Sequence, residues 1–187
     1  MICEIVAVGT EILLGDILNT DAQFLAQELS SLGITVYYQG VVGDNHDRLL
    51  AYAKQAIKRS DMVIFSGGLG PTTDDITKET VAEALSLPLE MHEESLERIR
   101  EFFKYREMSE NNLKQALVPK GTMALKNLNG TAPGFLYDKY GKIDVVLPGP
   151  PSELTTMFKT FVRPYLEKKA DGVLKSRLMR RRGFRIL

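Results

Sequence analysis

The 187-residue sequence has one cysteine, Cys3, and no apolar stretch close to the ~20 residues that a membrane-spanning helix needs. A single cysteine forms no internal disulfide, which fits a reducing compartment. The first five residues lack the basic start and the cleavage site of a secretory signal peptide. We therefore expect a cytoplasmic protein without a membrane partner. Because Cys3 lies in an apolar strand pattern, we expect it in the core rather than as a nucleophile.

The sequence also lacks internal repeats, low-complexity linkers and an overall excess of charge. It has 24 basic and 24 acidic residues, but six of the basic ones and no acidic one lie within residues 175–187. Residues 1–174 are therefore mildly acidic, and a nucleic-acid-binding surface is not expected there. Length and composition indicate one domain, at residues 1–171. We expect residues 172–187 to be a basic tail at the start of a missing following domain.

Apolar runs alternate with amphipathic helical patterns in the first half of the chain. Strands are predicted at residues 2–8, 34–42 and 62–65, and helices at 20–32, 47–59 and 77–86, with a turn at 9–19 and a break at 87–89. Such alternation is typical of α/β proteins with a parallel sheet and helices on both faces. The second half predicts a helix at 93–105, a less regular segment at 108–117, a strand at 122–125, a β-hairpin at 135–147 and a helix at 151–168.

One glycine-rich stretch, Ser66–Asp75 (SGGLGPTTDD), joins a predicted strand to a predicted helix. Glycines allow the backbone to adopt positive φ and to approach a ligand, so that several N–H groups point into one concavity beside a positive helix end. Such a turn suits a phosphate. Asp74 and Asp75 would repel that phosphate unless a cation lay between them, as Mg²⁺ does when it joins carboxylates to phosphate oxygens. The stretch therefore predicts a metal-assisted phosphate site.

Simpler interpretations of this stretch remain open. Asp74 or Asp75 also suits the N-cap of the following helix, and the glycines also suit a tight turn. The stretch lacks the Gly-Lys-Ser/Thr ending of a P-loop, and its Gly-Gly-Leu-Gly spacing is not that of a dinucleotide fingerprint. General rules therefore indicate a site here without naming its ligand.

Polar residues also follow the other predicted strands. Glu11 comes after the first strand and Asp44 after the second, where ligands of open α/β sheets collect. In a parallel sheet, Asp44 would face the same crevice as Asp74 and Asp75. N-capping of the next helix is the preferred interpretation for Asn19 and Thr20 and is also open to Asn45.

A second junction of strand, glycine and helix lies at Pro148–Glu153 (PGPPSE). Pro151 suits a first helical position, and the helix dipole alone accounts for Glu153 in the first turn. The preceding segment 127–135 has too many turn-forming residues to be a strand or helix and supplies exposed amides. We therefore expect a second wall of the ligand site here.

Five segments in order resemble the N-terminal domain of the CinA family (competence/damage-inducible protein CinA), which is similar to the molybdopterin-binding fold of MogA and MoeA. They are GTEILLG at 9–15 with Asn19-Thr20, VGDN at 42–45, SGGLGPT at 66–72 with Asp74-Asp75, NGTAPG at 129–134, and PGPP at 148–151 with Glu153-Leu154. The resemblance runs from the first strand to about residue 170. It implies a three-layer α/β/α domain with its ligand site at the carboxyl ends of the strands. Many relatives have Asn where this chain has Asp21.

The resemblance also implies an enzyme, a metal-dependent pyrophosphatase that converts ADP-ribose to AMP and ribose 5-phosphate. Longer members carry a C-terminal nicotinamide-nucleotide amidase domain, and an amidase function is not assigned to these residues. Family members are often dimeric, which makes a homodimer one possible assembly, although the sequence does not give the oligomeric state. Two alternatives remain: a molybdopterin-binding enzyme that adenylylates its ligand, and a nucleotide-binding module without catalysis.

The pyrophosphatase hypothesis assigns roles to individual residues. Asp75, with Asp74 or Asp44, would hold Mg²⁺ or another divalent metal, and Asp44 or Glu11 would orient the attacking water. The catalytic set is therefore Asp44, Asp75 and Glu11. The expected substrate-binding residues are Thr10, Asn19, Asn45, Gly67, Gly68, Gly70, Pro71, Thr72, Asn129, Gly130, Gly149, Pro150 and Glu153.

Overall fold

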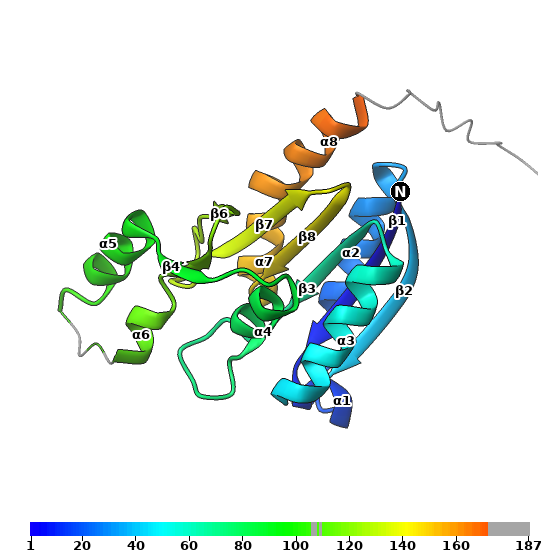
Figure 1. Ribbon diagram of the computed structural model, residues 1–187. Coiled ribbons are helices and arrows are strands. Elements are labelled where there is room, and N and C mark those ends of the chain that lie inside the picture. The colour runs from blue at the N-terminus through cyan, green and yellow to red at the C-terminus, as the bar shows by residue number, and fades with distance from the viewer. Residues whose placement is uncertain (106–107, 109, 172–187) are drawn as a thin grey trace, which may run out of the picture.

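A six-stranded sheet forms the centre of the computed structural model, which describes residues 1–105, 108 and 110–171 (Figure 1). Its strands in spatial order are β2 (Thr35–Val42), β1 (Ile2–Val8), β3 (Met62–Ser66), β8 (Lys142–Leu147), β7 (Gly134–Lys139) and β6 (Met123–Leu125). Neighbouring strands from β2 to β8 are parallel. The hairpin β7–β8 and the pair β6–β7 are antiparallel. The predicted α/β class, with a mostly parallel sheet and a β-hairpin, is confirmed.

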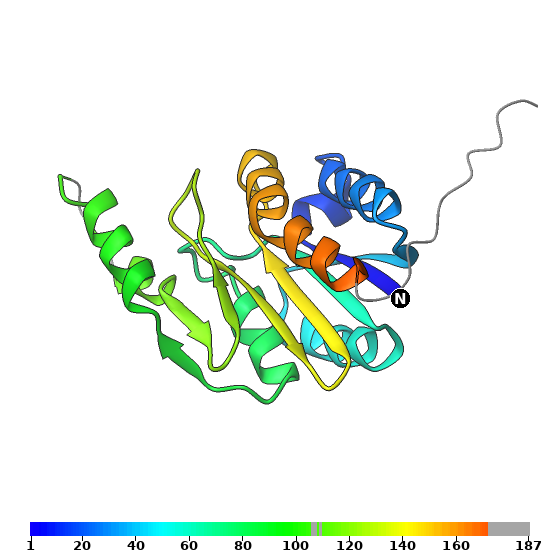
Figure 2. The same cartoon turned by 90° about the horizontal axis from the view of Figure 1, so that it is seen from above.

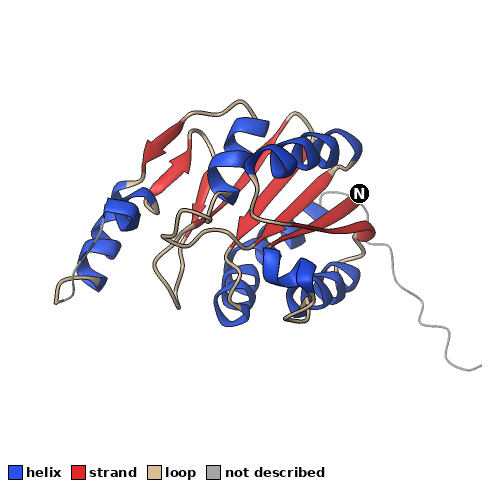
Figure 3. Ribbon diagram, turned by 90° about the horizontal axis from the view of Figure 1, so that it is seen from below, coloured by secondary structure: helices blue, strands red, loops and turns tan. Residues whose placement is uncertain are grey.

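Helices cover both faces of this sheet, which gives the expected three layers (Figures 2 and 3). One face carries α2 (Thr20–Ser31), α7 (Pro151–Met157), the π-helical segment η1 (Phe158–Val162) and α8 (Arg163–Asp171). The other face carries α3 (His46–Arg59) and α4 (Thr77–Ala84). Pro151 occupies the first position of α7, as predicted.

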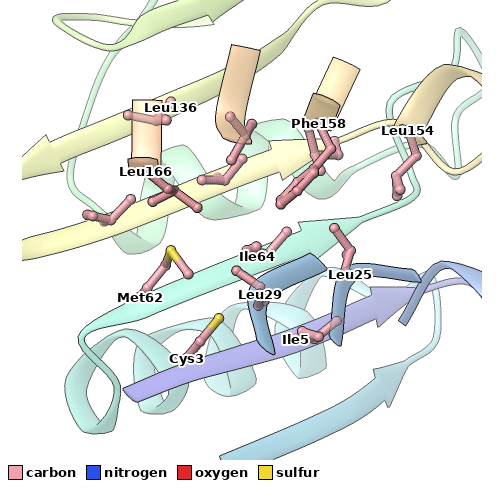
Figure 4. Close-up of a cluster of buried hydrophobic side chains, with 14 of the residues drawn as sticks. Cys3, Ile5, Leu25, Leu29, Met62, Ile64, Leu136, Leu154, Phe158 and Leu166 are labelled. Atoms are coloured by element: carbon pink, nitrogen blue, oxygen red, sulfur yellow. The ribbon is translucent and has the colours of Figure 1, made fainter. Parts of the chain in front are cut away.

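The alternation of side chains along each strand builds a separate apolar core on each face. In β1, Cys3 and Ile5 join the core beneath α2 and α7, whereas Val6 and Val8 join the core beneath α3 and α4. Figure 4 shows the first core, in which Phe158 packs among strand and helix residues. Cys3 is fully buried as a free thiol, so its predicted place in the core is confirmed.

A small lobe lies beside the main sheet (Figure 1). It consists of the antiparallel pair β4 (Leu89–Met91) and β5 (Leu117–Pro119), with α5 (Glu93–Phe102) and α6 (Glu110–Lys114). Because β4 begins at Leu89, the predicted break at 87–89 is wrong at its last residue. The segment 108–117, which was predicted as less regular, contains α6 and the first residue of β5. The predicted turn at 9–19 likewise contains the short helix α1 (Thr10–Leu14). Elements of three to five residues are shorter than the windows in which periodicity is detectable.

The carboxyl ends of the parallel strands lie level with one another. Val8 pairs with Val42, and Ser66 pairs with both Ala7 and Leu147. Backbone hydrogen bonds continue past the ladder from Gly9 N–H to the Val42 carbonyl and from Gly67 N–H to the Leu147 carbonyl. The loops that follow these strands therefore begin at one edge of the sheet.

Within the described residues, no helix has the length and apolar character to cross a membrane. The expectation for the basic tail at 172–187 falls outside the described residues.

Candidate functional site

A pocket of about 890 Å³ lies along the carboxyl edge of the parallel strands. Small-molecule sites typically have volumes of roughly 300–1,000 Å³, so this pocket is large enough for a nucleotide-sized ligand. Most residues within 8–21, 66–75, 129–132 and 148–153 line its walls, together with Asp44 and with single residues from α5 and from the α6–β5 connection. Segments that are far apart in sequence therefore meet at one site.

The structure brings together all the predicted site residues except Thr10 and Asn45, which do not line the pocket. Those that line it are Glu11, Asn19, Asp44, Gly67, Gly68, Gly70, Pro71, Thr72, Asp74, Asp75, Asn129, Gly130, Gly149, Pro150 and Glu153. Asp44, Asp74 and Asp75 face one crevice, as the parallel sheet predicted.

The glycine-rich turn has backbone geometry that side chains would prevent. Gly67 has φ of 97° and Gly68 has φ of 64°, both in the region that favours glycine. A Cβ atom on Gly67 would lie 2.2 Å from the Val8 carbonyl oxygen, and one on Gly68 would lie 2.2 Å from Thr77 Oγ1. The turn also packs against the second junction, because a Cβ on Gly149 would meet Gly67 Cα at 3.2 Å. The two junctions are therefore in contact where the glycine turn meets the second wall.

Asp75 holds the loop that follows these glycines. Its Oδ2 accepts hydrogen bonds from the N–H and the hydroxyl of Thr72, at 2.9 and 2.5 Å. The N-cap of α4 is Ile76, with no capping side chain, so the N-cap interpretation of Asp74 and Asp75 is wrong. A Cβ on Gly70 would lie 2.4 Å from Asp75 Oδ2. Glycine at position 70 therefore leaves room for the carboxylate.

Asp44 is held in the same way by Thr10. The N–H and the hydroxyl of Thr10 donate to Asp44 Oδ2 at 2.8 and 2.9 Å. Thr10 thus orients a pocket carboxylate although it does not line the pocket. Two amides are helix caps: Asn45 Oδ1 accepts from Arg48 N–H at 3.2 Å, and Asn19 Oδ1 accepts from Ala22 N–H at 3.1 Å. The capping interpretation of both is confirmed, and Asn19 lines the pocket as well.

The opposite wall is fastened to α7. Asn129 Nδ2 donates to the Ser152 carbonyl at 2.8 Å, and buried Asn127 Nδ2 donates to Glu153 Oε2 at 2.7 Å. A Cβ on Gly130 would lie 2.5 Å from that same carboxylate oxygen. Glu153 therefore fixes the 127–132 loop in addition to any interaction with the helix dipole.

Among the pocket residues that sequence reasoning did not place in the site, four carry polar or aromatic side chains from unexpected positions: Asp21, Phe102, Gln115 and Thr131. Burial raises the pKa of the Asp21 carboxyl to about 6. Gln115 and Phe102 come from the small lobe, whose position beside the pocket no local pattern indicates. For Asp21, the available signal was its departure from the Asn of many relatives.

The carboxylates of the pocket suit a metal that is shared with a ligand. Among the residues that the structure describes, no three Asp, Glu, His or Cys side chains form a cluster that could hold a metal alone. Mg²⁺ is usually bound by one or two carboxylates together with substrate phosphates and water. The oxygen donors of Asp44, Asp74 and Asp75 fit that mode of binding.

Comparison with known proteins places the chain in a family. A profile described as "Probable molybdopterin binding domain" (MoCF_biosynth) matches residues 4–168. A CinA-like protein of Kosmotoga olearia is 52% identical over 182 residues, which cover 96% of this chain and 44% of that protein. A CinA-like protein of Dictyoglomus turgidum gives the same identity and coverage. The chain thus spans less than half the length of these relatives.

Solved structures agree with this placement. The protein CinA from Thermoplasma acidophilum superposes with a TM-score of 0.82 and 34% identity, covering 87% of this chain and 96% of that chain. MoaB from Thermus thermophilus has a TM-score of 0.57 and 14% identity, with coverage of 89% and 96%, and so shares the fold. The chain belongs to the molybdopterin-binding domain family, and within it to the CinA-like proteins.

Proposed function

We propose that this domain hydrolyses the pyrophosphate bond of ADP-ribose and releases AMP and ribose 5-phosphate. The observation that carries the proposal is the pocket itself, in which a glycine turn and two threonine-anchored carboxylates meet in a space of about 890 Å³. A pyrophosphate ester needs this combination, because its charged oxygens require N–H donors and a cation while a water molecule requires an acceptor.

The glycine turn is assigned to a phosphate. The N–H groups of Gly67, Gly68 and Gly70 lie in a segment where side chains are excluded, so a phosphate can approach the backbone closely. Gly67 N–H already donates to the Leu147 carbonyl at 3.1 Å. Gly68 and Gly70 are therefore the stronger candidates for phosphate contact.

The carboxylates are assigned to metal binding and to the attacking water. Asp75, with Asp74 or Asp44, would hold a Mg²⁺ ion, which would neutralise charge on the phosphate oxygens. Asp44 or Glu11 accepts a proton from the water as its oxygen forms a new bond to phosphorus. The bond from that phosphorus to the bridging oxygen breaks, and its electron pair stays with the departing phosphate. Asn129, Gly130 and the Gly149-Pro150 turn then surround the nucleoside or the second ribose.

A second candidate function is favoured by the profile match and by the fold that this chain shares with MoaB. In this alternative the pocket binds a molybdopterin-like ligand, with or without its adenylylation. Such a protein would bind ligand in the same pocket but would form no AMP from ADP-ribose.

Product analysis tests the proposal. The purified chain is incubated with ADP-ribose and Mg²⁺, with EDTA in a parallel sample, and AMP is quantified by chromatography. We expect AMP only in the sample with metal. The absence of AMP in both samples would contradict hydrolysis, and saturable binding without turnover would favour the alternative.

The variant Asp75→Asn tests the role of the carboxylate. Its amide oxygen can still accept from Thr72, so the loop is retained while the charge is lost. We expect kcat to fall by about 100-fold, a loss comparable to that of one transition-state contact. Asp47→Asn serves as the matched control, because Asp47 is 97% exposed and does not line the pocket. Equal turnover by the two variants would exclude Asp75 from metal binding.

A further inference from the structure

The buried side chain of Gln115 connects two walls of the pocket. Gln115 is 3% exposed and lies between α6 and β5, in the small lobe. Its Nε2 donates to the Leu69 carbonyl at 3.2 Å, within the glycine-rich loop. Its Oε1 accepts from the Thr131 hydroxyl at 3.1 Å, in the opposite wall. One side-chain amide group therefore connects the glycine-rich loop to the 127–132 loop.

The backbone of Gln115 is itself held from two sides. Its N–H donates to the Asn112 carbonyl at 3.2 Å. Its carbonyl accepts from Lys78 Nζ at 2.9 Å, and the same ammonium donates to the Lys114 carbonyl at 3.1 Å. Lys78 is buried on α4, where desolvation lowers its pKa to about 8. The backbone that carries the Gln115 side chain is therefore held in place by these hydrogen bonds.

The bond to Leu69 has a consequence for the next residue. A trans peptide is planar, so the Leu69 carbonyl and the Gly70 N–H point in opposite directions. Since Gln115 binds the carbonyl, it also sets the direction of the Gly70 N–H. Glycine gives little resistance to rotation of its peptide, because it has no side chain to restrict φ and ψ. Among the described residues, the Gln115 hydrogen bond is the only one that a side chain makes to this peptide, so its loss leaves the peptide orientation without side-chain support.

We propose that Gln115 is a positioning residue of the site. It holds the Leu69–Gly70 peptide in the orientation that offers the Gly70 N–H to a phosphate, and through Thr131 it fixes the distance to the facing wall. The proposal rests on the function proposed above, in which Gly70 contacts the phosphate. Gln115 acts through the backbone and needs no contact with the reacting atoms.

Kinetics test this role with Gln115→Met, which keeps the length of the side chain and removes its hydrogen bonds. We expect kcat for ADP-ribose to fall by about tenfold while KM changes less, because displaced donors cost mainly transition-state stabilisation. Thr131→Val should give a smaller loss, whereas Thr131→Ser keeps the hydroxyl and should restore turnover. The double variant Gln115→Met/Thr131→Val should lose less than the product of the single losses, because Thr131 acts through Gln115.

Hydrogen–deuterium exchange gives a readout that needs no substrate. Gln115→Met should increase exchange in peptides covering both 67–76 and 127–134. The control, Tyr165→Phe, removes a hydrogen bond to Asp138 that lies outside the pocket and should leave both peptides unchanged. Thr131→Val provides the second variant if Gln115→Met fails to fold.

The outcomes separate the two proposals. Unchanged exchange in both walls, or increased exchange with wild-type kcat, would overturn the role of Gln115. A wild-type protein without turnover would contradict the proposed function, and the exchange experiment alone would then decide whether Gln115 holds the two walls.

Discussion

At the scale of single residues, the two anchored carboxylates have the same local chemistry. Asp44 and Asp75 each accept two hydrogen bonds on Oδ2, from the N–H and the hydroxyl of one threonine. Neither threonine engages the Oδ1 atom. Each carboxylate is therefore fixed in orientation while one oxygen stays available to a metal or a water. This arrangement suits a site in which charge must be placed before the ligand arrives.

Asp144 on β8 predicts a pH dependence of stability. It is 1% exposed, its Oδ2 has no hydrogen-bond partner among the described residues, and burial raises its pKa to about 7. Between pH 4 and 7 the folded state keeps a proton that the unfolded state releases, so the free energy of unfolding falls as pH rises through this range. Asp144→Asn has no such ionisation. We expect the free energy of unfolding of the wild type to fall by about 2 kcal/mol more than that of the variant between pH 5 and pH 8.

Urea unfolding at the two pH values measures this difference. Asp16→Asn, which changes an exposed carboxylate, is the control and should follow the wild type at both values. If the wild type and Asp144→Asn change in stability by the same amount between pH 5 and pH 8, the buried carboxyl does not titrate in this range and the prediction is wrong.

At the scale of elements, two asparagines cap two helices in the same way but have different relations to the pocket. Asn19 caps α2 and lines the pocket, whereas Asn45 caps α3 outside it. Loss of an N-cap costs about 1 kcal/mol. We expect Asn19→Ala and Asn45→Ala to lower the free energy of unfolding by similar amounts, and Asn19→Ala alone to raise KM for ADP-ribose. Unfolding curves and initial rates on the same preparations would test both parts, and an equal KM for the two variants would restrict Asn19 to capping.

The sequence predicted the long elements because their signals are local. Residues 2–8 and the hairpin strands are apolar runs with clear ends, and the glycine junctions mark where loops begin. Parallel pairing then predicted that Asp44 and Asp75 share an edge. In the lobe, helix α5 was predicted, but the strand pair was not, because β4 and β5 have three residues each and pair across a long connection. Gln115 could not be identified as a site residue, since its role depends on tertiary contacts with Leu69 and Thr131.

At the scale of the whole molecule, the pocket is formed where the glycine turn at the end of β3 meets the small lobe. The glycine turn follows β3 directly, so the sheet fixes its start. The small lobe contributes Phe102 and Gln115 to the pocket, and Lys78 of α4 holds the Gln115 backbone against the main domain. A ligand in the pocket would therefore bridge segments from residue 9 to residue 153 that come together only in the folded chain. Such a ligand binds the native state and not the unfolded one.

This bridging predicts thermal stabilisation by an ADP-ribose analogue whose bridging oxygen is replaced by a methylene group, so that it is not consumed. At 100 times its Kd, a ligand of the folded state adds about 2.7 kcal/mol to stability. For a domain of this size, that corresponds to a rise in Tm of roughly 5–10 °C.

Scanning fluorimetry with Mg²⁺ should show this shift, and with EDTA a smaller one, because the phosphate charges then face Asp44 and Asp75 without a cation. Asp75→Asn should reduce the difference between the two conditions. Equal shifts with and without metal would mean that the carboxylates bind no cation with the ligand, and the absence of any shift at millimolar analogue would mean that the pocket accepts a different ligand.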